Sequence, residues 1–318
     1  MHLVPRSAPT PALSPVPSAT DSLTAQQTPC PSETGMILRE ANAENLPLGR
    51  FPSVETSVNF DIPLVTYDVN GDKLSKPVLA DVPRSLVKVQ KEFALQRSAW
   101  DLFTALIPRD QRTMLGQFQI MTDGPGGVLS AVEQTREDAR RWVLEVDIAD
   151  IPDTKNLAFT LLHEFGHLLT LGPAQVPPDL QIFNDPQSSR IRDHAISACK
   201  NYFPGEGCSL STSYVNEFFD RFWKNLYDEW SAIDRMEEDD RKDARLHAFY
   251  RKYRDQFVDS YAVTSPVEDL AETWAFYVLS PWPTGTSIED QKLRFFYDYP
   301  ELVSLRASIL GNLCTAHP

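Results

Sequence analysis

The chain of 318 residues contains no apolar run long enough to cross a bilayer, so we expect no transmembrane segment. Basic residues are also scarce: 30 Lys and Arg against 44 Asp and Glu give a net charge of −14. This deficit argues against nucleic acid or an anionic membrane surface as the main partner. The hydrophobic content of 42% is nevertheless ample for a sizeable core, and the length suits one large domain or two small ones.

Cysteine is rare as well, and none of the four cysteines stands in a CxxC spacing, which argues against a zinc site built from thiolates. Four cysteines allow three complete disulfide pairings. Cys199 and Cys208 flank a loop that contains Pro204 and Gly205, and we favour a disulfide there. Cys30 and Cys314 lie near opposite ends of the chain, and chain ends often lie close together. Two disulfides would indicate an exported protein; the alternative is a cytosolic protein with four unrelated thiols.

The N-terminal region lacks the large apolar residues that a packed domain needs. Residues 1–7 resemble what remains of a thrombin-cleavable purification tag. Residues 8–50 are predicted to be a linker, because their first part is rich in Pro, Ser and Thr and cannot bury enough surface to order itself. A simple frayed terminus is the alternative. Such a stalk would tether the domain to a surface, and we expect a secreted or cell-surface protein of bacterial origin.

A β-hairpin extension is predicted at residues 51–81. Val65, Tyr67 and Val69 alternate onto one face of a strand, and the pair Asn70-Gly71 that follows favours a type I′ turn. The start of a calcium-binding EF-hand loop is the alternative interpretation. It is the weaker one, because Lys73 replaces the glycine of that loop and Leu79 its closing glutamate.

Residues 82–318 are predicted to form an α+β domain, mostly helical with a small twisted sheet. Helical spacing over residues 82–107 ends at Pro108, and the ranges 118–121 and 142–148 read as strands. The range 142–148 is the candidate for pairing with an extended substrate by strand addition. A helical, cysteine-bearing insertion is expected at about 174–258, with two long helices in 211–258 whose aromatic side chains pack in the core.

The most informative segment is His163-Glu164-Phe165-Gly166-His167, an HExxH motif inside an apolar helix that starts near Pro152 and stops at Gly172. Histidines four residues apart on a helix project from one face, so both imidazoles reach one metal ion. The glutamate between them can accept a proton from a metal-bound water. Two histidines merely satisfied by hydrogen bonds in the core are the alternative.

A third ligand must come from elsewhere in the chain. In metzincins the motif continues with a glycine and a third histidine, but Thr170 and Pro173 occupy those positions, which excludes that class. Glu268 and Glu272 lie four residues apart after Pro266, a residue suited to a helix start. A carboxylate ligand and a second acid that orients a histidine would have this spacing. An ordinary acidic first turn of a helix is the alternative.

With Tyr261 seven residues ahead of Glu268, and Ala271-Glu272 after it, the chain resembles the peptidase family of anthrax lethal factor and the bacterial Pro-Pro endopeptidases. The resemblance implies a zincin-like fold, zinc held by His163, His167 and Glu268, and Glu164 as general base. It implies that the Tyr261 hydroxyl stabilises the oxyanion or protonates the leaving amine, and that Glu272 is a supporting carboxylate. About a hundred residues separate His167 from Glu268, more than in compact members, so specificity is not carried over.

The sequence therefore predicts a secreted, zinc-dependent peptidase, most simply an endopeptidase, that acts on a peptide or protein substrate. One alternative is a secreted binding or adhesion domain in which the zinc site is structural or vestigial. A second alternative keeps the hydrolase but replaces the peptide with another amide or an ester. Structural zinc sites are closed by four protein ligands, whereas catalytic sites keep one position open.

Overall fold

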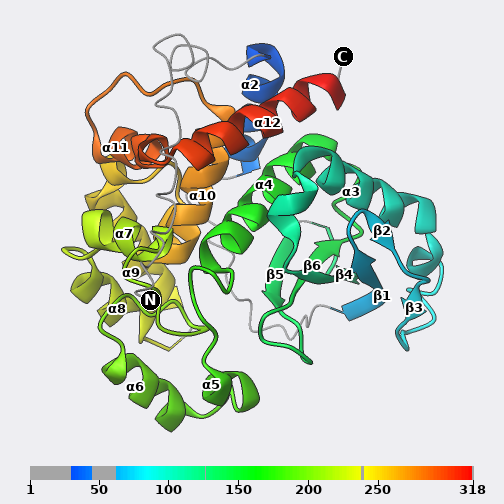
Figure 1. Cartoon of the computed structure of the whole chain (residues 1–318), viewed down its shortest axis with the longest axis horizontal. Helices are drawn as coiled ribbons and strands as arrows, with labels where there is room; N and C mark the ends of the chain where they lie inside the picture. Colours follow the sequence, from blue (N-terminus) through cyan, green and yellow to red (C-terminus); the bar gives the residue numbers. More distant parts are fainter. Residues whose placement is uncertain (1–29, 45–61, 126, 238–239, 317–318) are drawn as a thin grey trace, which may run out of the picture.

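A computed structural model describes residues 30–44, 62–125, 127–237 and 240–316, and it shows an α+β chain with one mixed sheet and many helices (Figure 1). The sheet has the strand order β2-β1-β4-β6-β5, with β3 paired to β1. The α+β class and the mainly helical content are as predicted. The strands are β1 (Ile62–Asn70), β2 (Lys73–Leu74), β3 (Val78–Leu79), β4 (Leu115–Thr122), β5 (Ser130–Gln134) and β6 (Trp142–Asp147).

The hairpin predicted at residues 51–81 is present, but it is part of the sheet and not an extension. Strand β1 pairs with β2 and β3 on one side and runs antiparallel to β4 on the other. Its alternating residues Val65 and Tyr67 are buried in the core. Residues 51–61 lie outside the described residues. The predicted boundary between a hairpin extension at 51–81 and a domain at 82–318 is therefore wrong, because β1 pairs with β4 and contributes buried residues to the core.

The turn type of this hairpin also differs from the prediction. Asn70 pairs with Lys73, so the two loop residues are Gly71 and Asp72. Gly71 has φ 63°, whereas no described residue other than glycine has a positive φ. A type I′ turn needs positive φ at both loop positions, while a type II′ turn needs it only at the first. The hairpin interpretation is confirmed over the EF-hand, because β1 and β2 pair across this turn and the Asp72 carboxylate forms an ion pair with Arg112.

The expected substrate-pairing strand, residues 142–148, is not free to take another strand. β6 lies between β4, to which it is parallel, and β5, to which it is antiparallel. Both of its edges are therefore occupied, and the prediction of strand addition at β6 is wrong. Among the described strands on this side of the sheet, β5 is the outer one. Trp142, Leu144 and Val146 are buried, because β6 is an interior strand whose faces are both covered.

The helix predicted over residues 82–107 is shorter than expected. Helix α3 spans Phe93–Leu106, and the preceding residues form turns and a short 3₁₀ segment at Val89–Lys91. The buried Gln90 amide donates hydrogen bonds to the carbonyls of Leu64 and Ala80 at 2.9 and 2.8 Å. These bonds tie the segment to the sheet, which apolar periodicity alone does not reveal.

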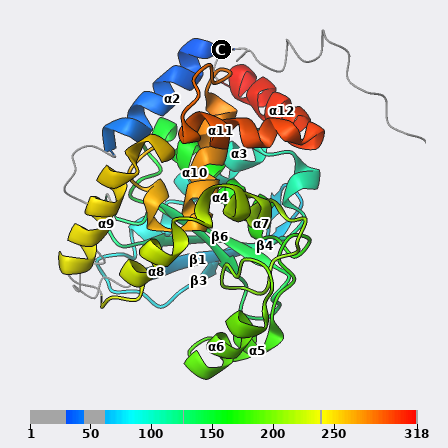
Figure 2. The ribbon, with the colours of Figure 1, turned by 90° about the vertical axis from the view of Figure 1, so that its left-hand side faces the viewer.

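The N-terminal linker predicted at residues 8–50 is partly wrong, because Pro31–Glu44 form helix α2. Its Thr34 and Ile37 side chains are buried, and the helix packs against helices α4 (Thr154–Leu171) and α10 (Pro266–Leu279). A disulfide joins Cys30 to Cys314, so α2 is fastened to the C-terminal helix α12 (Figures 1 and 2). Residues 1–7 and 8–29 lie outside the described residues.

The insertion predicted at about 174–258 is helical and carries the second disulfide, Cys199–Cys208. The first of the two long helices expected in 211–258 is broken, however. A five-residue π-helix at Phe219–Trp223 closes with a bond from the Lys224 amide to the Phe219 carbonyl, and the chain turns before continuing. The helices are α5 (Leu180–Asn184), α6 (Ser189–Ala198), α7 (Tyr214–Phe218), α8 (Tyr227–Asp234) and α9 (Asp240–Lys252).

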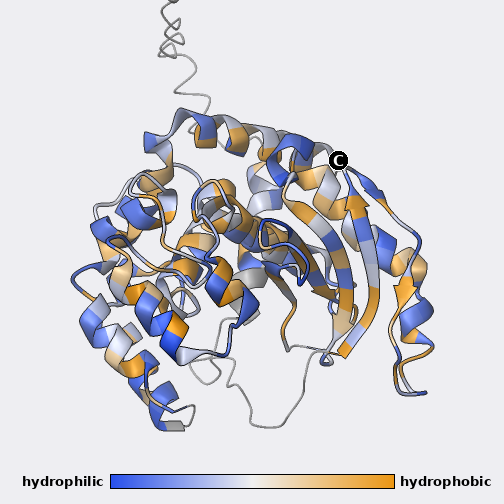
Figure 3. Cartoon of the chain, turned by 60° about the horizontal axis from the view of Figure 1, so that its bottom comes forward, coloured by the Kyte–Doolittle hydropathy of each residue, from blue (hydrophilic) through white to orange (hydrophobic). Residues whose placement is uncertain are grey.

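The remaining helices surround the centre of the molecule. They are α4 (Thr154–Leu171), α10 (Pro266–Leu279), α11 (Ile288–Phe295) and α12 (Pro300–Ala316). α4 lies between the sheet and the helical half, and α10 packs against it (Figure 1). Hydrophobic and hydrophilic segments alternate along the strands and helices, as expected for elements with one side on a core (Figure 3). No helix in the described ranges is long and apolar enough to cross a membrane.

Candidate metal centre

Helix α4 carries the HExxH segment and starts where the sequence predicts. The Asp153 carboxylate accepts hydrogen bonds from the backbone amides of Lys155 and Asn156, which caps the helix. His163, Glu164 and His167 are all buried on this helix, at 7%, 4% and 7% exposure. Buried ionisable groups need partners, so the surroundings of these three side chains decide what the segment can do.

Helix α10 supplies the third group. Ser265 caps the helix by accepting a hydrogen bond from the Glu268 amide at 3.1 Å, and Pro266 occupies its first turn. Ser265-Pro-Val-Glu268 has the spacing of a capping box, in which the glutamate would reach back to the cap residue. Here the Glu268 carboxylate extends to the two histidines of α4 instead. A common helix-start motif thus contributes the third group of a possible metal site.

The two helices approach closely at Gly166, inside the motif. A Cβ added to Gly166 would lie 3.0 Å from the Ala271 Cα and 3.1 Å from the Trp274 ring. Small residues at a crossing allow helix backbones to come near each other. The glycine of HExxH and the alanine of Ala271-Glu272 therefore bring α4 and α10 together, and with them the histidines and Glu268.

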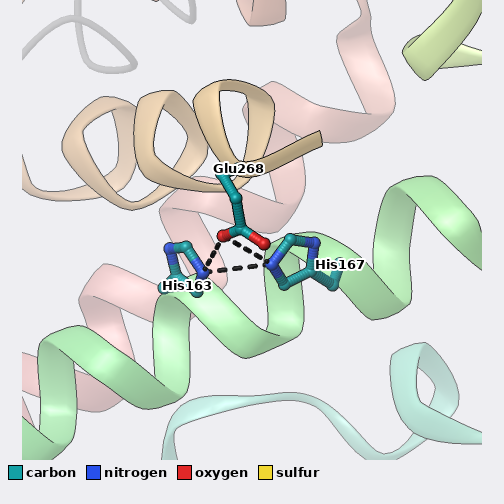
Figure 4. A group of neighbouring side chains, drawn as sticks. All are labelled: His163, His167 and Glu268. Atoms are coloured by element: carbon teal, nitrogen blue, oxygen red, sulfur yellow. Dashed lines mark hydrogen bonds and ion pairs between the residues drawn. The ribbon is translucent and has the colours of Figure 1, made fainter. Parts of the chain in front are cut away.

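Three ligand atoms converge between the helices (Figure 4). His163 Nε2 lies 3.0 Å from His167 Nε2, and Glu268 Oε2 lies 3.1 and 3.2 Å from these two nitrogens. Tetrahedral ligands at about 2.0–2.1 Å from an ion are separated by about 3.3–3.4 Å. The donor set of two imidazole nitrogens and one carboxylate oxygen can therefore hold a metal ion. In the described part of the chain the group contains these three residues alone.

Glu272 supports the site from one turn further along α10. Its Oε1 atom lies 3.1 Å from His163 Nδ1, on the opposite side of the ring from the converging Nε2 atom. A carboxylate at Nδ1 favours the tautomer whose Nε2 lone pair is available to a metal. Burial by itself lowers the pKa of His163, but the charges and hydrogen bonds of Glu272 and Glu268 outweigh it and raise that pKa well above its ordinary value. The carboxylates of Glu272 and Glu268 thus favour positive charge at the site.

The pKa values of Glu164 and Glu268 are shifted in opposite directions. Burial raises the pKa of Glu164, although the neighbouring histidines oppose that shift. Burial also acts to raise the pKa of Glu268, but His167 and His163 outweigh it and hold that pKa well below its ordinary value. A carboxylate that stays ionised suits a ligand, whereas one with a raised pKa suits proton transfer.

Tyr261 lies beside the site, as its spacing from Glu268 predicts. Its ring centroid is 5.8 Å from that of His163, with the planes inclined by 60°. Burial, together with the carboxylates of Glu268 and Glu164, raises the pKa of its hydroxyl well above the ordinary value. The group is therefore a neutral hydrogen-bond donor over the whole physiological range.

Two acids near the centre were not found from the sequence. Asp259 is buried, accepts a hydrogen bond from the Ala262 amide at 2.8 Å, and so shapes the turn that carries Tyr261. Burial and the neighbouring Glu272 raise its pKa well above the usual range. Glu206 lies in the disulfide loop; burial raises its pKa, and the charge of His167 opposes that shift. Neither residue stands in a recognisable spacing, because only the fold brings them close.

All six residues predicted for the site gather around the crossing of α4 and α10: His163, Glu164, His167, Tyr261, Glu268 and Glu272. Of the other histidines, His194 lies on α6 and lines a separate pocket between α5 and α6, and His317 lies outside the described residues. No protein-family model, curated protein or solved structure matches this chain. The interpretation of the site therefore rests on its own geometry and on the motif.

Proposed function

We propose that this protein is a zinc-dependent peptidase of the zincin-like, glutamate-completed type, acting on peptide or protein substrates outside the cytoplasm. The observation that carries the proposal is a donor set of two buried imidazoles and one half-buried carboxylate, beside a buried glutamate with a raised pKa and a half-buried tyrosine. Three protein ligands suit a catalytic zinc, since structural zinc sites have four. The two disulfides are typical of proteins from oxidising compartments and support export.

His163, His167 and Glu268 would hold the ion, and Glu272 would keep the His163 ring in the orientation that ligation needs. A bound zinc ion supplies a Lewis acid and lowers the pKa of a water molecule. Glu164 accepts the proton of the attacking water, for which its raised pKa suits it. The Tyr261 hydroxyl donates a hydrogen bond to the carbonyl oxygen as negative charge develops on it.

The proposal is tested by a peptide-library cleavage assay on the zinc-loaded protein, with and without chelator. We expect chelator to abolish cleavage and zinc to restore it. Glu164→Gln should retain zinc while losing most turnover, by a factor of about 10²–10⁴ if general-base catalysis is lost. Cleavage that chelator does not affect, or undiminished turnover in Glu164→Gln, would contradict the proposal.

A further inference from the structure

The insertion helices form a cavity that opens beside the metal centre. Its volume is about 300 Å³, and its lining includes Tyr261 and Glu268 of the site itself. The rest of the lining comes mainly from α8 and α9, which lie side by side next to α10 (Figures 1 and 2). Ligand pockets span about 300–1,000 Å³. The cavity is therefore sized for a single large side chain of a substrate bound at the metal centre.

The apolar part of the cavity lining is largely buried. Trp230, Ile233 and Leu246 contribute to its lining, and the first two are buried. The indole of Trp230 donates a hydrogen bond to the Val263 carbonyl at 3.1 Å. This bond joins α8 to the turn that follows Tyr261. The wall of the cavity and the predicted oxyanion donor are thereby held in one arrangement.

The charged part of the lining is mainly acidic. Asp234 and Asp243 face the cavity together with one cation, Lys242. Lys242 Nζ lies 3.6 Å from Asp234 Oδ1, and the lysine side chain is 13% exposed against 51% for the aspartate. Glu268 also lines the cavity, but its carboxylate is turned to the histidines. Among the residues that line the cavity, two aspartates stand against one lysine, so the lining itself carries net negative charge beside its apolar side chains.

We infer that this cavity binds a basic substrate side chain, arginine or lysine, next to the scissile bond; the inference rests on the proposed function. The aliphatic stem packs against Trp230, Ile233 and Leu246, as long basic side chains do on apolar surfaces. The charged end reaches Asp234 and Asp243, and a guanidinium can donate to two carboxylates at once. An acidic side chain would meet like charges and is disfavoured.

The test uses matched arginine and citrulline compounds, because citrulline has the shape of arginine without its charge. Acetyl-arginine amide and acetyl-citrulline amide are titrated into the zinc-loaded protein, and the indole N–H signal of Trp230 is followed by NMR. Peptides that carry either residue at the cleavage position found in the library are then compared. We expect the arginine compounds to bind tighter and to be cleaved with about tenfold or greater kcat/KM, equal to about 1.4 kcal/mol.

Substitutions of charged lining residues test whether the preference for arginine over citrulline depends on the charge of the cavity. Asp234→Asn should reduce the arginine-over-citrulline ratio several-fold, and Lys242→Gln should increase it, because each removes one charge from the lining. Asp228→Asn is the matched control: it makes the same change at an exposed position of α8 outside the cavity, and should leave the ratio unchanged.

The outcomes separate this inference from the proposed function. Arginine-selective binding without any cleavage would uphold the pocket and overturn the peptidase. Zinc-dependent cleavage with equal rates for arginine and citrulline, unchanged in Asp234→Asn, would overturn the pocket and leave the peptidase standing. If neither binding nor cleavage is seen, both are contradicted.

Discussion

At the scale of single residues, the proposed site suits chemically similar groups to different tasks by giving them different surroundings. Glu268 faces two imidazoles and stays ionised, whereas burial raises the pKa of Glu164 one turn of helix away from the second histidine. Glu272 touches the far nitrogen of His163. One type of side chain can thus serve as ligand, base and orienting group, because the neighbours set which protonation state prevails.

Tyr261→Phe tests the task given to the tyrosine. The phenylalanine ring can keep the contact with His163, but the hydroxyl is lost. We expect kcat to fall by about 10²–10³, as when one oxyanion donor is removed, with unchanged zinc content. Steady-state kinetics and metal analysis on the same samples check this. A variant that lost its zinc, or kept full turnover, would show that the hydroxyl has another role.

Five of the six site residues that the sequence identified share one property: their spacing is local to a helix. The sixth, Tyr261, lies before α10 and was identified from the family resemblance. His163, Glu164 and His167 lie within five positions of one helix, and Glu268 and Glu272 within five positions of another. Asp259, Glu206 and the cavity lining come from loops and helices that only tertiary packing brings to the site. Helical periodicity carries no information on such contacts, so these residues could not be predicted.

At the scale of elements, the position of α10 depends on a buried ion pair next to Glu268. Asp269 accepts hydrogen bonds from Trp223 of the insertion at 2.7 Å and from Lys292 of α11 at 2.5 Å. Both charged side chains are fully buried. The pair ties α10 to α11 and to the insertion, so the ligand on α10 is fixed by contacts on the other side of the helix.

Lys292→Met should therefore destabilise the protein by about 3–5 kcal/mol, since it leaves the Asp269 charge buried without its partner. Lys252→Met is the matched control: its ion pair with Glu229, at 2.7 Å, is exposed to solvent, so its loss should destabilise the protein much less. Denaturant unfolding of both variants measures the difference. Equal losses of stability in the two variants would refute the anchoring role of Asp269.

Elements were predicted well where one pattern dominates, and less well where side chains override it. The α4 helix begins and ends as its cap and glycine indicate, but the aromatic stretch after Ser213 does not stay helical. There the Trp223 indole donates a hydrogen bond to the Asp269 carboxylate, and residues 219–223 form a π-helix instead of continuing the α-helix. Residues 142–148 were predicted to be a strand that could pair with substrate, yet both edges of β6 are paired within the sheet. Whether a strand lies at the edge or in the interior is a property of the whole sheet.

At the scale of the whole molecule, the two disulfides close loops of very different size. Cys30–Cys314 spans 284 positions and joins α2 to the C-terminal helix, whereas Cys199–Cys208 spans only 9. The sequence favoured the second from the composition of its loop, whereas the first was only a possible pairing, suggested by the frequent closeness of chain ends. Helix α2 was not predicted, because the Pro-, Ser- and Thr-rich residues before it led to the interpretation of the whole range 8–50 as a linker. Its Ile37 is nevertheless buried in the core.

Removing the long-range disulfide should cost more stability than removing the local one. Loop-closure entropy predicts a loss of about 5–6 kcal/mol for Cys30→Ser/Cys314→Ser against about 2–3 kcal/mol for Cys199→Ser/Cys208→Ser. Chemical unfolding of both double variants in zinc-loaded form compares them. A larger loss from the local pair would contradict this ordering and would indicate that the disulfide loop, not α2, secures the fold.

The central claim is that His163, His167 and Glu268 together bind one zinc ion. The most direct measurement is a crystal structure of the zinc-loaded protein with data collected on both sides of the zinc absorption edge. We predict a single anomalous peak about 2.0–2.1 Å from both Nε2 atoms and from the Glu268 carboxylate, with a remaining position open to solvent. A peak coordinated by other residues, or no peak at stoichiometric zinc, would contradict the account.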